Sequence, residues 1–382
     1  MTAAEDPTFK DRRAQNTPDN FTKPAEGWPR WIIYMLASLV FGAIGGVIFH
    51  WLTMPLAWMI GAMIFTTGAA LSGAPVRGSR RIRTIFIPVL GIMLGSSFTP
   101  ETLGQVSSWV PSVVTMLLFV VIVVAAVGVF LHKAMGFGPV SAYFSATPGG
   151  LATMVVIGGE MGGDERRIGL THSIRIMLTV LIIPFYFRIF EGYVPGGLEP
   201  LGSFVDLSLQ DAAILASCML GYPLFKVLRL PSAQILGPMI LSAIIHMTGL
   251  TTAKPPVEIV NVAQLVIGTG IGARFVGVSV MRLYPVMVAA TGGTIFMVGF
   301  AAVAALALEA LTGLPFAAIW LAFAPGGVAE MTLISLALGV DVAFVSTHHL
   351  VRVVFMVIAA PMIFHFIDDK WSLREDSDDH KF

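Results

Sequence analysis

One carboxylate stands alone in a long apolar stretch of this chain, where it could do chemistry. Glu330 is the only acidic residue between Glu309 and Asp341. A carboxylate inside an apolar layer is energetically costly, so it predicts a functional site, here one for a proton or a cation. Glu330 also lies three positions after a Pro-Gly-Gly sequence, where an acidic side chain can bind the free N–H groups of a starting helix. The sequence leaves both roles open, and they are compatible with each other.

The Pro-Gly-Gly sequence before Glu330 occurs twice and predicts a break in a helix at each place. Proline removes a backbone donor and clashes with the preceding turn, and two glycines add backbone freedom. The N–H groups at a new helix end favour an anion and the carbonyl groups favour a cation. A structural kink that lets two helices pack closely is the alternative. The candidate binding residues at the two breaks are Pro148, Gly149, Gly150, Thr153, Pro325, Gly326, Gly327 and Glu330.

A further polar pattern, an aspartate followed by a histidine and an arginine, comes after each break. Its two copies are Asp164, His172, Arg175 and Asp341, His349, Arg352. On a helix the three side chains fall within about 80° of one another. The aspartates precede apolar helices, as N-caps do. We expect the deeply placed arginines to pair with a carboxylate or with carbonyl groups of the broken helix, or to bind an anionic substrate group. The histidines could relay protons or serve packing alone.

Both patterns belong to a longer repeat. From 148 to 184, 12 of 37 positions are identical to the segment 177 residues later, without a gap. Farther upstream the offset is 176, and Pro55 and Gly61 match Pro231 and Gly237. We therefore predict a tandem duplication. In membrane proteins, paired helix breaks at corresponding positions of two halves predict a central binding site.

The composition predicts a membrane protein. Hydrophobic residues make up 56% of the chain and charged residues only 12%, whereas soluble domains carry about 25% charge. Helices of about 20 apolar residues cross the hydrocarbon layer, and five clear runs reach that length: Ile32–Leu52, Val110–Leu131, Ile168–Phe187, Val286–Leu308 and Val342–Phe366. We predict an all-α, polytopic transmembrane fold with two internal repeats, each containing a broken Pro-Gly-Gly helix.

Polar and charged segments divide the chain into five parts. We expect a disordered cytoplasmic tail at 1–30, membrane repeats at 31–190 and 207–366, a linker at 191–206 and an acidic tail at 367–382. Each repeat should contain six hydrophobic elements. Those of the first lie near 31–52, 54–72, 84–98, 110–131, 139–160 and 168–189. Those of the second lie near 207–228, 231–249, 258–275, 284–308, 315–338 and 342–366.

Lysine and arginine residues in short loops predict the orientation in the membrane. The basic residues before position 31 place the N-terminus in the cytoplasm, and the loop with Arg77, Arg80, Arg81 and Arg83 lies on the same side. If each Pro-Gly-Gly element crosses the membrane, the repeats are parallel. If it dips in and returns, they are inverted. Charge placement favours inverted repeats and leaves the parallel arrangement open.

Signatures of enzymes and of nucleic-acid binding are weak. Cys218 is the only cysteine and the eight histidines are dispersed, so we expect neither a disulfide framework nor a metal site. The glycines of 268–272 fall in a predicted spanning helix, where they indicate close packing rather than a nucleotide site. We expect no enzymatic activity, no cofactor and no direct contact with nucleic acid.

The motifs together resemble the AbrB family of integral membrane proteins over roughly residues 30–366. The resemblance rests on Gly237-Pro238-Met239, on Gly-x-x-x-Gly-x-x-Phe, on Ala-Pro-Gly-Gly-x-Ala-Glu-Met and on His-x-x-Arg. In the first half, Thr147 and Thr153 depart from the pattern, so the pattern does not predict a symmetric pair of carboxylates. The family is often labelled "ammonia monooxygenase" or "AbrB family transcriptional regulator". The resemblance thus implies an effect on gene expression, which would be indirect because the chain has no DNA-binding module.

Broken helices in two repeats are also similar, at the level of fold alone, to secondary carriers such as bile-acid symporters and cation:proton antiporters. The leading hypothesis is a carrier of the cell (inner) membrane that holds a small solute between the two breaks and uses a proton or cation gradient. The alternative is a membrane-embedded regulator or sensor that binds a ligand without moving it, and a membrane enzyme comes third. Expected partners are the lipid bilayer, a small solute or ion, and further copies of the chain.

Cysteine labelling tests the arrangement of the repeats. Single cysteines at positions 163 and 340, each after a Pro-Gly-Gly element, should react with a membrane-impermeant reagent from opposite sides of the membrane if the repeats are inverted. Reaction of both positions from the same side would contradict the inverted arrangement.

Overall fold

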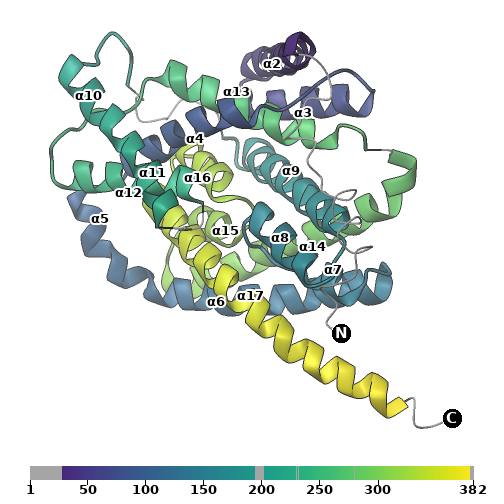
Figure 1. Cartoon of the computed structure of the whole chain (residues 1–382). Coiled ribbons are helices and arrows are strands. Elements are labelled where there is room, and N and C mark those ends of the chain that lie inside the picture. The colour runs from purple at the N-terminus through teal and green to yellow at the C-terminus, as the bar shows by residue number, and fades with distance from the viewer. Residues whose placement is uncertain (1–27, 194–201, 229, 231, 279, 379–382) are drawn as a thin grey trace.

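The computed structural model describes residues 28–193, 202–228, 230, 232–278 and 280–378. These residues form a bundle of helices without a β-strand among them (Figure 1). Five of their helices are long and apolar enough to cross a membrane: Arg30–Trp51, Val106–Ala134, Glu165–Phe190, Tyr284–Thr312 and Val342–His365. The predicted all-α fold with membrane-spanning helices is therefore confirmed.

Helices form close to the predicted places in both halves. Those of the first half are α2 (Trp28–Trp51), α3 (Ala57–Leu71), α4 (Arg80–Gly95), α5 (Pro100–Gln105), η1 (Val106–Trp109), α6 (Val110–Val129), η2 (Phe130–Ala134), α7 (Pro139–Ala146), α8 (Leu151–Glu160) and α9 (Glu165–Phe190). Those of the second are α10 (Leu209–Ser217), η3 (Cys218–Leu220), α11 (Gly221–Val227), α12 (Ala233–Met247), α13 (Val257–Gly272), η4 (Ala273–Phe275), α14 (Val280–Thr312), α15 (Phe316–Phe323), α16 (Val328–Ala337) and α17 (Val342–Asp378).

Both Pro-Gly-Gly sequences interrupt a helix, as predicted. The first separates α7 from α8 and the second separates α15 from α16. The residue before each proline has an extended backbone, with ψ of 120° at Thr147 and 141° at Ala324. Proline disfavours the helical conformation in the residue before it, so the first helix ends at that point.

The helices form two groups, and each group contains elements of both halves of the chain. In the crossed-helix group, residues 28–95 and 209–275, α3 packs against α13 and α4 packs against α12. In the break group, residues 110–190 and 280–365, α14 packs against α9, and α17 packs against α7 and α15. The main contacts between the groups join α4 to α16 and α17, and α3 to α9. Figure 1 shows α2, α3 and α13 at the top of the view and α6 and α7 at the bottom.

Glycines let the crossed helices touch backbone to backbone. A methyl group added at Gly91 of α4 would strike the carbonyl oxygen of Ile235 in α12, and one added at Gly268 of α13 would strike that of Met59 in α3. Small residues at such crossings are typical of membrane helices that pack closely. Since each contact joins one half of the chain to the other, the halves interlock. The packing role predicted for the glycines of 268–272 is confirmed at Gly268 and Gly272, where an added methyl group would strike the backbone of α3.

The outer helices present an apolar surface. Only 28% of the spanning part of α2 is buried, compared with 56% of that of α17. Exposed side chains on the outer helices include Val40 on α2, Leu118 on α6 and Val303 on α14. An exposed apolar surface of this extent is typical of a protein that contacts lipid. The buried charged residues Arg175, Glu330 and Arg352 lie on other helices, namely α9, α16 and α17.

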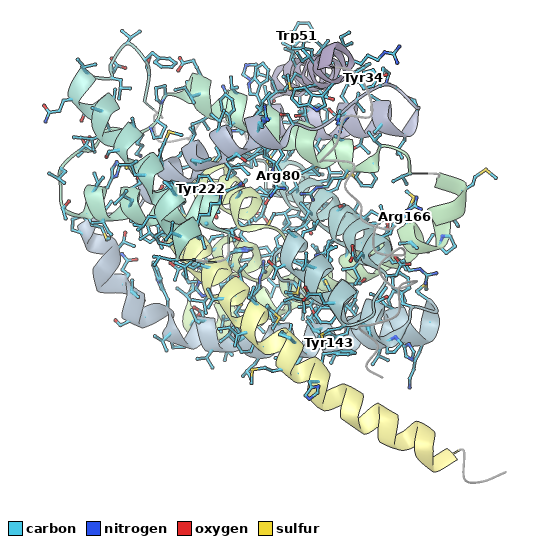
Figure 2. All side chains as sticks on the ribbon, in the orientation of Figure 1. Tyr34, Trp51, Arg80, Tyr143, Arg166 and Tyr222 are labelled. Atoms are coloured by element: carbon cyan, nitrogen blue, oxygen red, sulfur yellow. The ribbon has the colours of Figure 1, made fainter. Side chains whose placement is uncertain are left out.

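Tyr143 of α7 links the two halves within the break group. Its hydroxyl group donates to the carbonyl oxygen of Ala360 at 3.0 Å, and its ring packs against Phe364. Figure 2 shows Tyr143 beside α17, whereas Tyr34 and Trp51 lie on α2 at the opposite edge of the molecule.

Some elements differ in extent from the predictions. Helix α4 begins at Arg80 rather than at 84, because Ser79 caps it by accepting a hydrogen bond from the N–H group of Ile82. The element expected at 207–228 is divided into α10, η3 and α11, where Gly221 contacts the backbone of Gly237. Helix α17 continues beyond 366 to Asp378. Of the predicted tail at 1–30 and linker at 191–206, residues 1–27 and 194–201 lie outside the described residues.

The variant Gly91→Ala should destabilise the protein, because the added methyl group forces α4 away from α12. Overpacking of this kind costs about 1–3 kcal/mol. The control is Gly299→Ala in α14, where an added methyl group has no neighbour within 4 Å in the described part of the chain and should be neutral or stabilising. Thermal unfolding in detergent measures both variants. Equal midpoints would contradict the close crossing of α4 and α12.

Candidate functional site

At the first break, an arginine covers the carbonyl groups at the end of the helix. Arg175 of α9 donates to the carbonyl oxygens of Ser145, Ala146 and Thr147 at 3.1, 3.4 and 3.3 Å. The arginine is only 3% exposed. The last carbonyl groups of a helix have no partner within it and carry partial negative charge. Arg175 therefore supplies both hydrogen bonds and positive charge to the carbonyl end of α7.

Arg352 of α17 has the same role at the second break. It donates to the carbonyl oxygens of Ala324 at 2.6 Å and of Gly326 at 2.7 Å, and it is 1% exposed. Of the partners that the sequence left open for the two arginines, the structure therefore shows the carbonyl groups of the broken helices.

A histidine positions each arginine. Nδ1 of His172 lies 2.9 Å from Nη2 of Arg175, and Nε2 of His172 lies 2.9 Å from the carbonyl oxygen of Phe144. His349 makes the same two contacts at 2.8 Å, with Arg352 and with the carbonyl oxygen of Leu321. Because a guanidinium group only donates, Nδ1 must accept and Nε2 must carry the proton. Both rings are then neutral and occupied on both nitrogens, as the packing role predicts.

Asp164 and Asp341 begin the helices that carry these pairs. Asp164 accepts hydrogen bonds from the N–H groups of Arg166 and Arg167 at the start of α9. Asp341 accepts one from the N–H group of Phe344 at the start of α17, at 3.0 Å. The predicted N-cap role of both aspartates is confirmed.

The two breaks differ in depth. Helix α16 is buried along nearly its whole length, whereas only Met154 and Gly158 are buried in α8. Thr153 of α8, which corresponds to Glu330, is partly exposed. A ligand site shared equally between the two breaks does not fit this difference. The second break is the better candidate.

Glu330 lies in the first turn of α16 and is 7% exposed. Its carboxylate folds back over Gly327, where a Cβ atom would strike one of its oxygens. Among the described residues it has no hydrogen-bond partner and no cation within 4 Å. A first-turn acid that served its own helix would accept from the N–H groups of α16, and Glu330 does not. It is therefore a buried carboxylate available to a proton or a ligand.

Two arginines that the sequence patterns did not point to act on Glu330. Arg83 of α4 and Arg274 of η4 both interact with its charge electrostatically. Nε of Arg83 and Nη1 of Arg274 are buried and have no hydrogen-bond partner in the described chain. Both arginines come from the crossed-helix group, whereas Glu330 belongs to the break group.

The prediction that Arg80, Arg81 and Arg83 lie in a loop is wrong, whereas their cytoplasmic side stays a prediction. Because α4 begins at Arg80, Arg83 lies on its first turn and is partly buried, while Arg80 and Arg81 remain exposed. Arg274 did leave a signal in the sequence, since it is the only charged residue between Glu258 and Arg282.

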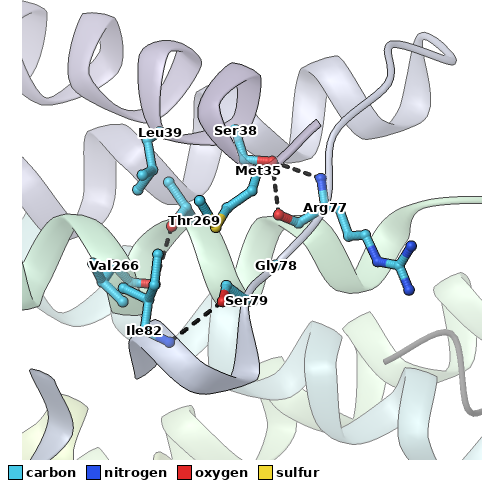
Figure 3. A pocket seen from close by; sticks show the side chains of 9 residues that line it. All are labelled: Met35, Ser38, Leu39, Arg77, Gly78, Ser79, Ile82, Val266 and Thr269. Atoms are coloured by element: carbon cyan, nitrogen blue, oxygen red, sulfur yellow. Dashed lines mark hydrogen bonds between the residues drawn. The ribbon is translucent and has the colours of Figure 1, made fainter. Parts of the chain in front are cut away.

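Hydrogen bonds before α4 hold the chain at the start of this helix (Figure 3). The hydroxyl group of Ser38 in α2 donates to the carbonyl oxygen of Arg77 at 3.1 Å and accepts from its N–H group at 2.6 Å. Ser79 then caps α4 through the N–H group of Ile82 at 3.3 Å. These residues line a small crevice between α2, α4 and α13. With the chain held on both sides of residue 78, the first turn of α4 has a defined direction.

Further buried side-chain atoms lack hydrogen-bond partners. Within the described residues, the hydroxyl oxygens of Thr66, Ser145 and Thr171 and the Nε atoms of Arg175 and Arg352 are buried without a hydrogen bond. Buried polar atoms are normally hydrogen-bonded, so these atoms are candidates for contacts with water or a ligand. In the same residues, no three His, Cys, Asp or Glu side chains gather as metal ligands would.

The fold and this polar centre define a polytopic helical membrane protein with two interrupted helices and a buried, incompletely paired cluster of charges. The chain belongs to the AbrB family, whose model, described as "Transition state regulatory protein AbrB", matches residues 58–368. The family resemblance inferred from the motifs is therefore confirmed.

Two relatives match most of the chain. One is "Uncharacterized protein YhjN" of Bacillus subtilis (strain 168), 24% identical over 352 residues, which cover 86% of this chain and 92% of that protein. The other is "Putative regulator AbrB" of Escherichia coli (strain K12), 22% identical over 339 residues, which cover 88% of this chain and 96% of that protein.

The variant Arg352→Gln should lower the free energy of unfolding by about 3 kcal/mol or more, because buried carbonyl groups and His349 lose a charged donor. The control is Arg166→Gln at an exposed position of α9, which should change it by less than about 0.5 kcal/mol. Denaturant unfolding in detergent measures both. Similar stabilities of the two variants would contradict the capping role of Arg352.

Proposed function

We propose that this protein is a secondary carrier of the cell (inner) membrane, with its N-terminus in the cytoplasm, that moves a small solute together with a proton or a cation. The observation that carries the proposal is Glu330, a carboxylate 7% exposed at a helix break, without a hydrogen bond or a close cation among the described residues. Ionisable residues buried at membrane depth are typical of proton and ion pathways.

The interrupted helix supports the same function. Carriers commonly bind substrate where a helix stops within the membrane, because the half-helix ends offer free backbone groups to a ligand. At the second break, Arg352 occupies the carbonyl end of α15. The N-terminal end of α16 remains for a ligand, since Gly327 provides no side-chain cap in the described structure.

The division into two groups of helices supports alternating access. The site lies between them, because the break group contributes Glu330 and the crossed-helix group contributes Arg83 and Arg274. The groups meet mainly through α4 and α3 on one side and α16, α17 and α9 on the other. Movement of one group against the other would open the site to either side of the membrane while each group keeps its own packing.

A regulator or sensor is the second candidate. The family description and the name of the Escherichia coli relative both refer to regulation. In this alternative the same site binds a ligand without translocating it, and the effect on gene expression is indirect. Neither candidate requires an enzymatic step, a cofactor or contact with nucleic acid. The lipid bilayer and the solute or ion are the partners in both, and self-association is compatible with either.

The variant Glu330→Gln should abolish gradient-driven uptake, because the amide keeps the shape of the side chain but cannot exchange a proton or balance a cation. The measurement is uptake of labelled organic acids, amines and amino acids into proteoliposomes with an imposed proton or sodium gradient. Glu160→Gln, at the exposed end of α8, is the control and should transport normally. Unchanged coupled uptake by Glu330→Gln would remove Glu330 from the mechanism.

A further inference from the structure

We propose, on the basis of the carrier function above, that the solute is a small oxyanion held by Arg83 and Arg274, and that it binds together with a proton on Glu330. The shared chemistry is that of carboxylates and phosphate, whose oxygens match the planar donor fork of a guanidinium group. The three residues come from α4, η4 and α16, so the anion would lie between the crossed-helix group and the break group.

The charged side chains of α4, η4, α9, α16 and α17 leave an excess of positive charge around Glu330. Arg175 and Arg352 are occupied by the carbonyl groups at the breaks. Arg83 and Arg274 have no such partners among the described residues, and Glu330 is the one acid that acts on both. One carboxylate cannot balance two guanidinium groups. A bound anion supplies the missing charge in a region where an unbalanced charge is costly.

Buried hydrogen-bond donors without a partner also favour a bound anion. Nε of Arg83 and Nη1 of Arg274 are buried without a hydrogen bond in the described chain. Thr66, whose side chain packs against Gly272 two residues before Arg274, has a buried hydroxyl oxygen that is also without a partner there. The first N–H groups of α16 add donors and the positive end of a helix dipole. Cation binding would use few of these groups, whereas an oxyanion can accept from all of them.

The proton follows from competition for the two arginines. An ionised Glu330 offsets part of their charge and weakens an anion in the same place. A protonated Glu330 leaves both guanidinium groups to the anion. By thermodynamic linkage, protonation then strengthens anion binding and anion binding favours protonation to the same degree. One proton and one anion would therefore cross together.

Other ionisable groups around α16 do not replace Glu330 in this role. On α9 and α17, His172 and His349 use both ring nitrogens, and Arg175 and Arg352 are held by carbonyl groups. On α17, His348 is bonded to Ser112 and to the carbonyl oxygen of Phe344. On α4, Arg80 and Arg81 are exposed. Helix α15 has no ionisable side chain. Glu330 therefore remains as the proton site of the proposal, and its charge acts on both Arg83 and Arg274.

Binding is measured on the purified full chain in detergent. The anionic probes are labelled acetate, succinate and inorganic phosphate, and the cationic probe is labelled choline. We expect at least one anion to bind, and the comparison of acetate and succinate with phosphate identifies the source of the oxyanion. Arg83→Ala and Arg274→Ala should each weaken its binding by about tenfold or more, since each removes a charged donor. Arg81→Ala, at an exposed position on the same helix turn, should bind normally.

Further measurements distinguish a loss of anion binding from a loss of folding. Arg83→Lys keeps the charge but not the donor fork, so it should retain the unfolding midpoint and still bind the anion more weakly than the wild type. In a weakly buffered solution, addition of the anion should cause proton uptake by the wild type. Glu330→Gln should bind the anion equally well at all pH values tested and take up no proton. Wild-type binding should strengthen as the pH falls.

Defined results would overturn the proposal. These are binding of none of the three anions to the folded wild type, binding unaffected by both Arg83→Ala and Arg274→Ala, and equal proton uptake by the wild type and Glu330→Gln. The carrier function is tested separately by uptake into proteoliposomes. Anion binding without uptake would reject the carrier and keep the anion site, whereas uptake of choline alone would reject the anion site and keep the carrier.

Discussion

The hydrogen bonds from Arg175 and Arg352 to the ends of α7 and α15 make interrupted helices possible inside an apolar bundle. Each break leaves carbonyl groups that water cannot reach, and an unpaired backbone group in such a place costs several kcal/mol. A guanidinium group supplies both donors and positive charge at the negative end of the helix. The histidine three residues earlier holds it in position. The carbonyl ends of α7 and α15 are satisfied in this way. The N–H groups at the starts of α8 and α16 remain without a side-chain cap in the described structure.

The crossings of α4 with α12 and of α13 with α3 join the two halves of the chain. Gly91 and Gly268 allow backbone contact between the halves, so neither half is a separate body. Each half contributes to the crossed-helix group and to the break group. A cluster of charges formed by α4, η4 and α16 therefore lies at a boundary between groups of helices rather than within one of them. Under the proposed alternating access, relative motion of the groups would change the distances within that cluster.

The framework occurs in both halves of the chain, but the charged cluster occurs once. At the offset of 177, His172 and Arg175 have His349 and Arg352 as counterparts, whereas Glu330 has Thr153, Arg83 has Val260 and Arg274 has Ser97. Capping a broken helix is a backbone requirement that both halves share. Under the proposed function, binding a solute requires one set of charges in one place, and two such sets would bring several unpaired charges into the same apolar region. The deeper burial of α16 than of α8 agrees with this division.

Local chemistry was sufficient for the helices, the two breaks, the aspartate N-caps and the isolation of Glu330. Apolar length, the missing donor of proline and the position of an acid relative to a helix start are all properties of neighbouring residues. The sequence limited the partners of Arg352 to a few classes of chemical group. It could not select among them, because the carbonyl oxygen of Ala324 that Arg352 binds lies 28 residues away in the chain. Arg83 resembled a loop charge and Arg274 resembled an isolated one. Whether a charged side chain faces water or a buried carboxylate depends on which distant helices pack over it, and only the tertiary structure decides that.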